Sequence, residues 1–331
     1  MSGRLPLLVA VALATGALFA RNLGFGIDAF NRVVPASAGT AAAFSPASFE
    51  IDAVTFAEAV DPIRRAIFAV ALGVTDEFEA EYRPLARAPF ELSVTNQFRL
   101  IWAHAIAVYE PRMVDPTFRL GVQELYGVEV CRAKFPLGVE AWVKTGFVDA
   151  FDDWRLPPVQ QREGYSLHDL VSVEAIAAPS NGVRRTLPTH TLYRVPLLDG
   201  KQLYAFVPKP GRSVSSLRAR LTSVTLSDIL ATDAAVIDPP VPVRVALPPM
   251  DIVSTNELMG AFQYFRFPTG GLRPFSPSSQ PELLRQIVRL RLTPAAADPA
   301  AEPLEGPFLF FIYDPDLNSV PIAGIYPGKG L

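Results

Sequence analysis

The chain contains only three histidines, His104, His168 and His190. Ser166, His168 and Asp169 supply the residue types of a nucleophile, a base and an acid. They lie too close together along one strand or turn for an ordinary catalytic triad, whose members converge from separate segments. The sequence therefore predicts no catalytic residue and no enzymatic activity.

Two glycine-containing motifs also fail as chemical sites. Residues 211–215 (Gly-Arg-Ser-Val-Ser) miss the G-x-S-x-G spacing of a nucleophile elbow by one residue, and we interpret them as a hairpin turn leading into a helix. Gly24, Gly26 and Ala29 fit G-x-G-x-x-A, but they open no βαβ unit. We therefore expect no dinucleotide or other cofactor.

The sequence also lacks a recognisable metal motif. Asp152-Asp153 and the pair Asp314 and Asp316 form no six-ligand loop with its usual glycine, so we predict solvated turns there. No Cys/His spacing is suited to zinc, and we predict no metal site. Cys131 is the only cysteine, so it forms no internal disulfide and is predicted to be a small buried hydrophobe.

Charge and the N-terminal run restrict the partners and the location. The formal net charge is -3 and the basic residues are scattered, which argues against binding to nucleic acid. After Arg4, residues 5–20 form an apolar or small run like that of a secretory signal peptide. A signal anchor, a buried start of the first helix and a cytoplasmic location remain alternatives. We expect residues 1–20 to be a signal peptide of a secreted protein, without a stable membrane span, and residues 21–331 to be one domain.

Helical spacing dominates early in the chain and short β-prone runs dominate later. The predicted helices cover residues 22–33, a run that begins at Ser45-Pro46, and residues 56–72, 115–126 and 139–148. The predicted strands cover residues 100–109, 128–130, 170–176, 191–196, 202–207, 241–247, 287–292, 308–312 and 320–326. This order predicts an α+β protein.

Several segments follow one another in the order of one protein family. They are Asn22, Phe25, Asp28 and Phe30; residues 44–48; residues 100–109 with His104; and residues 115–118, 126–130, 142–144, 195–208, 247–252 and 318–324. The most specific segment is at the end of the chain, at Pro307, Phe308, Leu309, Phe310 and Phe311. Together the segments resemble the serpin family. The resemblance implies N-terminal helices, a central mixed β-sheet and smaller β-sheets, partly truncated because residues 176–192 form a shorter connection than in that family.

Serpin inhibition depends on a long reactive loop that is cleaved and then inserted into the central sheet as a new strand. The resemblance places this loop at Pro294, Ala295, Ala296, Ala297, Asp298, Pro299, Ala300, Ala301, Glu302, Pro303 and Leu304. Eleven extended residues reach about 36 to 40 Å, too little to present a bait segment and also supply a full strand. The three prolines lack the N–H group that a central strand must donate. We predict that inhibition by trapping is lost.

The resemblance also implies a polar region where the central sheet opens. It assigns Ser45 and Ser48 to this region, with Glu174 in place of a buried Asn and Arg285 near its His partner. A Glu–Arg pair could replace a neutral hydrogen bond only if both charges are matched, because an unpaired buried charge costs several kcal/mol.

The predicted function is binding without inhibition. The partner would be a protein or a small apolar ligand, and the oligomeric state stays open. The alternative is an inhibitor of a serine or cysteine protease that uses the short loop as a plug. Five aromatic residues are predicted to pack in the core, with an exposed patch as the alternative: Phe262, Tyr264, Phe265, Phe267 and Phe275.

Overall fold

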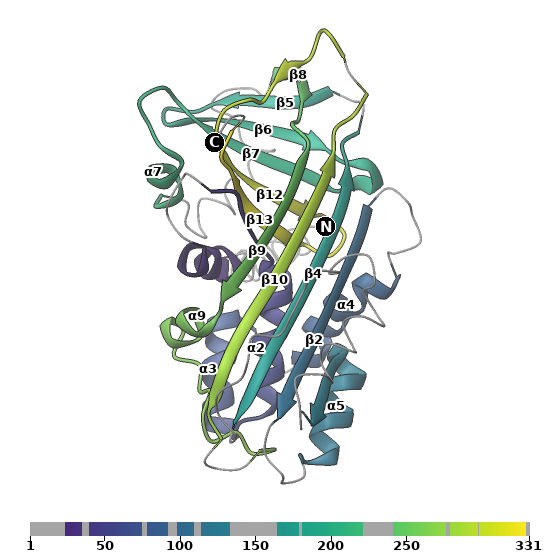
Figure 1. Ribbon diagram of the computed structural model, residues 1–331, viewed down its shortest axis with the longest axis vertical. Coiled ribbons are helices and arrows are strands. Elements are labelled where there is room, and N and C mark those ends of the chain that lie inside the picture. Colours follow the sequence, from purple (N-terminus) through teal and green to yellow (C-terminus); the bar gives the residue numbers. More distant parts are fainter. Residues whose placement is uncertain are drawn as a thin grey trace, which may run out of the picture.

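Two β-sheets and a group of helices beside one of them make up the fold in a computed structural model of the chain (Figure 1). The structure describes residues 24–34, 40–74, 78–91, 98–108, 114–132, 164–178, 181–220, 241–275, 279–296 and 298–328. The predicted signal peptide, the predicted helix over 139–148, Asp152 and Asp153 lie outside these residues, as does the side chain of Cys131.

A five-stranded sheet runs along the length of the molecule (Figure 1). Its order is β3 (Val128–Arg132), β2 (Phe98–Val108), β4 (Tyr165–Ile176), β10 (Pro281–Thr293) and β9 (Met250–Glu257). The two central strands, β4 and β10, are parallel, whereas β2 is antiparallel to β4 and β9 is antiparallel to β10. The predicted mixed central sheet is confirmed. The strands extend beyond the predicted apolar runs because backbone pairing continues through polar residues such as Arg99 and His168.

The second sheet has eight strands. Its order is β1 (Ala42–Phe44), β13 (Ser319–Tyr326), β12 (Phe308–Asp314), β7 (Gln202–Pro208), β6 (His190–Pro196), β5 (Asn181–Thr186), β8 (Val241–Ala246) and β11 (Glu302–Pro303). Strands β6 and β7 form the hairpin expected at Asp199-Gly200, where both residues have positive φ, at 71° and 77°. Phe308, Leu309, Phe310 and Phe311 are all buried in β12.

The helices begin and end at residues whose types favour caps. The structure describes a helix over residues 24–33 and six others: α2 (Pro46–Glu58), α3 (Pro62–Leu72), α4 (Phe78–Glu91), α5 (Pro116–Tyr126), α7 (Val214–Arg218) and α9 (Met259–Tyr264). The predicted helix over 56–72 is wrong as one unit. Asp61 caps α3, and Pro62 favours its first turn, so α2 ends before α3 starts. None of the described helices is long and apolar enough to cross a membrane.

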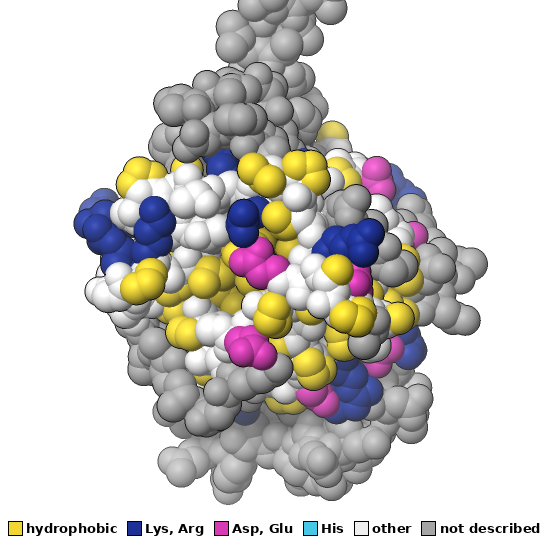
Figure 2. All heavy atoms as spheres, turned by 90° about the horizontal axis from the view of Figure 1, so that it is seen from above, with side chains coloured by type: hydrophobic (Ala, Val, Ile, Leu, Met, Phe, Trp, Pro, Cys, Tyr) yellow, Lys and Arg dark blue, Asp and Glu magenta, His cyan; other side chains and the backbone are white. Residues whose placement is uncertain are grey.

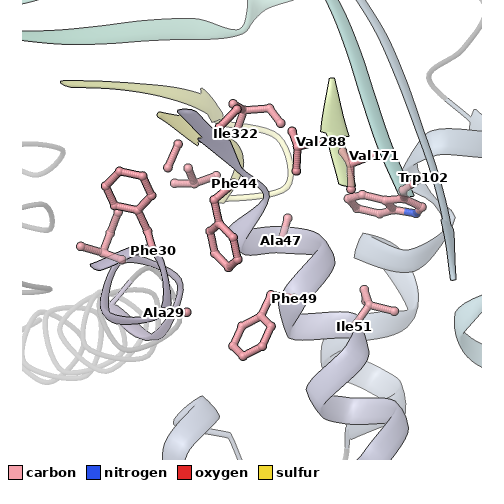
Figure 3. Close-up of a cluster of buried hydrophobic side chains, with 14 of the residues drawn as sticks. Ala29, Phe30, Phe44, Ala47, Phe49, Ile51, Trp102, Val171, Val288 and Ile322 are labelled. Carbon is pink, nitrogen blue, oxygen red and sulfur yellow. The ribbon is translucent and has the colours of Figure 1, made fainter. Parts of the chain in front are cut away.

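Helix α2 lies inside the molecule, between the two sheets and the other helices. Figure 3 shows Phe44 of β1 and Ala47 of α2 below Ile322 of β13 and Val288 of β10, with Phe49 further down the helix. Nearly every residue of α2 is buried, including Glu50 and Asp52. A helix buried on all sides places its polar side chains against the sheets, so they must find partners there.

The aromatic group is mainly part of the core. Phe262, Phe267 and Phe275 are buried, as predicted, but the Tyr264 ring is half exposed. The guanidinium carbon of Arg32 lies 3.8 Å from the centre of the Tyr264 ring, a cation–π contact.

Candidate functional site

The segment that follows β10 is short, and its far end is attached to the edge of the eight-stranded sheet. Strand β11 pairs in parallel with Val245 and Ala246 of β8, and the Leu304 N–H donates to Ala246 O at 3.0 Å. Eight residues, 294–301, separate β10 from β11. The predicted loop is therefore a surface connection that ends in a strand.

Side chains also fix this connection. Glu302 accepts hydrogen bonds from Arg184 Nη1 at 2.9 Å and from the Tyr193 hydroxyl at 2.7 Å. Asp298 accepts one from Arg244 Nη1 at 3.2 Å. Figure 2 looks onto this end of the molecule and shows hydrophobic side chains interspersed with charges of both signs. The described part of this face therefore carries charges of both signs rather than one.

The outer face of the five-stranded sheet carries a row of ion pairs. Arg291 lies opposite Glu174 in the register of β10 and β4, with Nη1 3.4 Å from Oε1, and Arg99 of β2 reaches the same carboxylate at 4.0 Å. Further along β10, Arg285 pairs with Glu257 of β9 at 3.2 Å. Glu174 and Arg285, predicted to pair, are therefore held by different partners. Glu174 is about half exposed, so it is not the buried group that the sequence implied.

The inner face of the same sheet carries a buried polar cluster. Three of its residues come from the start and first turns of α2, and one each comes from β2, β4 and β10. We call this set the α2–sheet cluster: Ser45, Ser48, Asp52, His104, Asp169 and Gln286. All six are buried, with exposed fractions of 1 % or less.

Gln286 and Ser48 bind the two sides of Asp169. Ser48 Oγ donates to Asp169 Oδ1 at 2.5 Å, and Gln286 Nε2 donates to Asp169 Oδ2 at 2.6 Å. The Gln286 amide also accepts from the Ser45 N–H at 2.8 Å and donates to Ser45 O at 3.0 Å. One side chain thus joins β10 to β4 and to the start of α2.

His104 faces both carboxyl groups of the cluster. Its Nδ1 lies 2.8 Å from Asp52 Oδ1 and 3.7 Å from Asp169 Oδ1. Burial raises the pKa of Asp52 well above its usual range, and a hydrogen bond with Asp169 opposes this shift. Burial, reinforced by the charge of Asp52, raises the pKa of Asp169 to about 8. Burial also lowers the pKa of His104.

Solved structures with the same arrangement of sheets and helices exist. The thermophilic serpin tengpin in its native state superposes with a TM-score of 0.76 at 13% identity, over 94% of each chain. A Manduca sexta serine protease inhibitor, serpin-12, gives 0.75 at 15% identity, over 94% of this chain and 99% of its own. Human thyroxine-binding globulin in a ligand complex gives 0.73 at 12% identity, over 95% and 99%. The chain has the serpin fold. No family model matches the sequence, and no curated protein matches it.

The structure places the four residues assigned to the sheet-opening region on two faces of the central sheet. Ser45 and Ser48 lie beneath the inner face. The polar pair that joins β4 and β10 on this inner face is Asp169 with Gln286, not Glu174 with Arg285. Sequence reasoning missed Gln286 although it is the only uncharged polar residue in an apolar and Arg-rich stretch, residues 283–292.

The structure also places two groups of residues that the sequence analysis considered for chemistry. Ser166 Oγ lies 2.8 Å from His168 Nε2, whereas the neighbouring Asp169 points toward α2, so the three residues do not converge. Asp314 was predicted in a solvated turn, and this is wrong. It is fully buried, with Oδ2 3.2 Å from Lys201 Nζ, although Asp316 is exposed.

The turn at Gly211 leads into a helix, as predicted. Ser213 caps α7 directly after this turn.

The α2–sheet cluster contains a group of metal-donor atoms that the sequence did not indicate. No metal motif was expected, yet donor atoms of Asp52, His104 and Asp169 all lie within 4.8 Å of one another. Spacing rules overlook this group because its members come from three separate elements.

Proposed function

We propose that this chain is a secreted, non-inhibitory protein with the serpin fold, whose function is to bind a protein or a small apolar ligand. The observation that carries the proposal is the eight-residue connection between β10 and β11. A reactive loop that traps a protease has to be long enough to present a bait and then extend along the sheet.

The dimensions of the sheet support this proposal. Strands β4 and β10 contain 12 and 13 residues and pair directly to their ends, where Thr293 lies opposite Ile176. A full inserted strand would need roughly as many residues and a length of about 40 Å at ~3.3 Å per residue. Residues 294–301 also have to turn before they enter the sheet. Prolines at 294 and 299 would remove two of the donors that such a strand needs.

The contacts that hold the connection after β10 to the eight-stranded sheet also support the proposed loss of inhibition. Insertion would have to break the β11–β8 pairing and the contacts of Glu302 with Arg184 and Tyr193. On the sheet itself it would separate Asp169 from Gln286 and Glu174 from Arg291. Each hydrogen bond or ion pair contributes modestly, but those in the buried cluster leave unsatisfied polar groups when they are broken.

The binding function and the secretion are parts of the same proposal. The serpin fold is compatible with binding as well as with inhibition, because its solved examples include a thyroxine-binding globulin and a serine protease inhibitor. Secretion rests on the apolar run over residues 5–20. Expression in a secreting host and mass measurement of the released chain test it, and a chain retained intact in the cell contradicts it.

Limited proteolysis within residues 294–301, followed by thermal unfolding, tests the loss of insertion. The expected Tm of the cleaved chain is equal to or below that of the intact chain, because no strand is added to the sheet. A large rise in Tm after cleavage shows that the segment inserts and contradicts the proposal. The matched control is a chain in which residues 294–301 are replaced by Gly and Ser. This chain should still bind the protein or ligand that the parent chain binds.

The alternative function is inhibition by a short, rigid loop. The observation that favours it is that Pro299 and Ala300 are exposed while Asp298 and Glu302 on either side are fixed by side-chain contacts. A panel of serine and cysteine proteases distinguishes the two functions. Reversible inhibition that the Gly/Ser replacement abolishes supports the alternative, and absence of inhibition supports the binding protein.

A further inference from the structure

Two carboxyl groups and an imidazole meet beneath the five-stranded sheet without a cationic side chain beside them. In the described part of the chain, no Lys or Arg forms an ion pair with Asp52 or Asp169, and the titratable group beside both carboxyls is the imidazole of His104. A buried carboxyl without a cation beside it either keeps its proton or coordinates a metal, because removing an unpaired charge from water is costly. Donor atoms of the two carboxyls and of the imidazole all lie within 4.8 Å of one another.

We propose that Asp52, His104 and Asp169 form a binding site for one divalent transition-metal ion, with Zn²⁺ as the representative ion. The proposal is independent of the binding function proposed above. It rests on the donor types, their convergence from α2, β2 and β4, and the hydrogen bonds that orient them.

The positions of the donor atoms suit a small ion. His104 Nδ1 lies 2.8 Å from Asp52 Oδ1 and 3.7 Å from Asp169 Oδ1. In a tetrahedral site with ligand distances of about 2.0–2.2 Å, neighbouring ligand atoms are about 3.3–3.6 Å apart. Small side-chain rotations therefore bring the three atoms to this spacing. Three protein ligands also leave a fourth position for water or a hydroxyl group.

An unpartnered atom at the same place is a second observation. Oδ2 of Asp52 is buried and has no hydrogen-bond partner among the described residues. A native structure normally satisfies such an oxygen. A metal ion would satisfy it either by bidentate binding or by exchange with Oδ1 as the ligand, since either oxygen of a carboxylate can coordinate.

Neighbouring side chains hold one of the proposed ligands in place. Ser48 Oγ and Gln286 Nε2 donate to the two oxygens of Asp169 and fix the plane of its carboxyl group. Metal sites depend on such outer hydrogen bonds, whose loss commonly lowers metal affinity by about 10- to 100-fold. Removal of Ser48 Oγ should therefore weaken the site without removing a ligand.

The donor set also indicates the class of ion. One imidazole and two carboxylates suit Zn²⁺, Mn²⁺ or Fe²⁺, whereas Mg²⁺ and Ca²⁺ prefer oxygen donors alone. Since the ligands are almost fully buried, the ion would enter when α2 separates from the sheet or while the chain folds. The bound ion would then join α2 directly to β2 and β4.

The test uses the full chain without a histidine tag, stripped with EDTA and loaded with ZnCl₂ both by incubation and by refolding. The expected result is about one Zn²⁺ per chain after desalting and a Tm higher by about 5 °C, since an ion that binds only the folded chain stabilises it. Loading with Co²⁺ should give the visible absorption of a four- or five-coordinate site. MgCl₂ should give neither retention nor a shift.

Variants locate the ion. Asp52→Asn should retain no Zn²⁺ and lose the Tm rise, while its metal-free form is as stable as the parent because a buried carboxyl is gone. Ser48→Ala should bind about 10- to 100-fold more weakly. Asp314→Asn, which alters a buried carboxyl elsewhere, is the matched control and should retain the ion. The proposal is overturned if the parent retains no Zn²⁺ under either loading condition, or if Asp52→Asn retains as much as the parent.

Discussion

Gln286 of β10 donates a hydrogen bond of 2.6 Å to Asp169 of β4, on the inner face of the sheet and at the boundary where the two central strands meet. The same amide exchanges two hydrogen bonds with the backbone of Ser45, which caps α2. One buried side chain therefore connects three elements that would have to separate if the sheet opened.

Gln286→Leu tests how much this connection contributes. The substitution keeps the volume but leaves Asp169 Oδ2 and the Ser45 N–H without their partner, whereas Ser45 O keeps its hydrogen bond from the Phe49 N–H. Each unsatisfied buried group costs about 1–3 kcal/mol, so the free energy of unfolding should fall by about 2–4 kcal/mol. Urea unfolding measures it. Arg285→Gln, on the outer face of the same strand, is the control, and a Gln286→Leu value as small as the control value would contradict the prediction.

The ion pair of Arg291 and Glu174 should contribute far less. Its side chains are 42% and 43% exposed, and exposed ion pairs are worth about 0–1 kcal/mol. A double-mutant cycle with Glu174→Gln and Arg291→Gln measures the coupling free energy in urea. A coupling that weakens at high salt and stays below about 1 kcal/mol is expected. A coupling as large as the effect of Gln286→Leu would mean that the outer face also holds β4 and β10 together.

The contrast between these two pairs explains what could be predicted from the sequence. The buried strands and the helix caps follow from local signals, such as the apolar run 308–312 and the residues Asp115 and Gly127 around α5. The face of the sheet on which an individual residue lies does not follow from such local signals. Strand β4 is buried on both faces, so it shows no apolar–polar alternation that would separate Asp169 from Glu174.

In β10, successive side chains point to opposite faces of the sheet, so an alignment that is wrong by one residue assigns a side chain to the wrong face. Arg285 and Gln286 are neighbours, yet the first lies on the outer face and the second on the inner face. The α2–sheet cluster was likewise hidden, because Asp52 lies within a helical run whose sequence does not indicate that all of its faces are buried. Only the packing of α2 against β2 and β4 brings Asp52 to His104.

The contacts of Glu302 should control access to the connection after β10. Glu302→Gln weakens the ion pair with Arg184, and Tyr193→Phe removes the hydroxyl donor. The double variant should be cleaved about 5- to 10-fold faster within residues 294–301, since about 1–1.4 kcal/mol of local stability is lost and cleavage follows the population of the open form. Mass spectrometry of a protease time course measures the rate. Glu124→Gln on α5 is the control, and equal rates in all three chains would refute the role of Glu302.

His190 should make folding sensitive to acid. Burial, followed by the positive charge of Lys209, lowers the pKa of His190 to about 4, while the unfolded chain has the ordinary value of about 6.5. Below pH 6.5 the unfolded chain therefore binds the proton first, so stability that is fully present above pH 6.5 is lost progressively down to pH 4.

Replacement of His190 by Phe should remove this part of the acid sensitivity. The ring packs 5.5 Å from the Phe206 ring, and its Nδ1 lies 2.9 Å from Thr189 Oγ1. After allowance for solvent screening, the parent should lose about 1–2 kcal/mol more than His190→Phe between pH 7 and pH 4.5. Urea unfolding at a series of pH values measures both chains. Because His104 and His168 titrate in both, the difference between the two curves isolates His190, and parallel curves would show that its pKa is the same in the folded and unfolded chains.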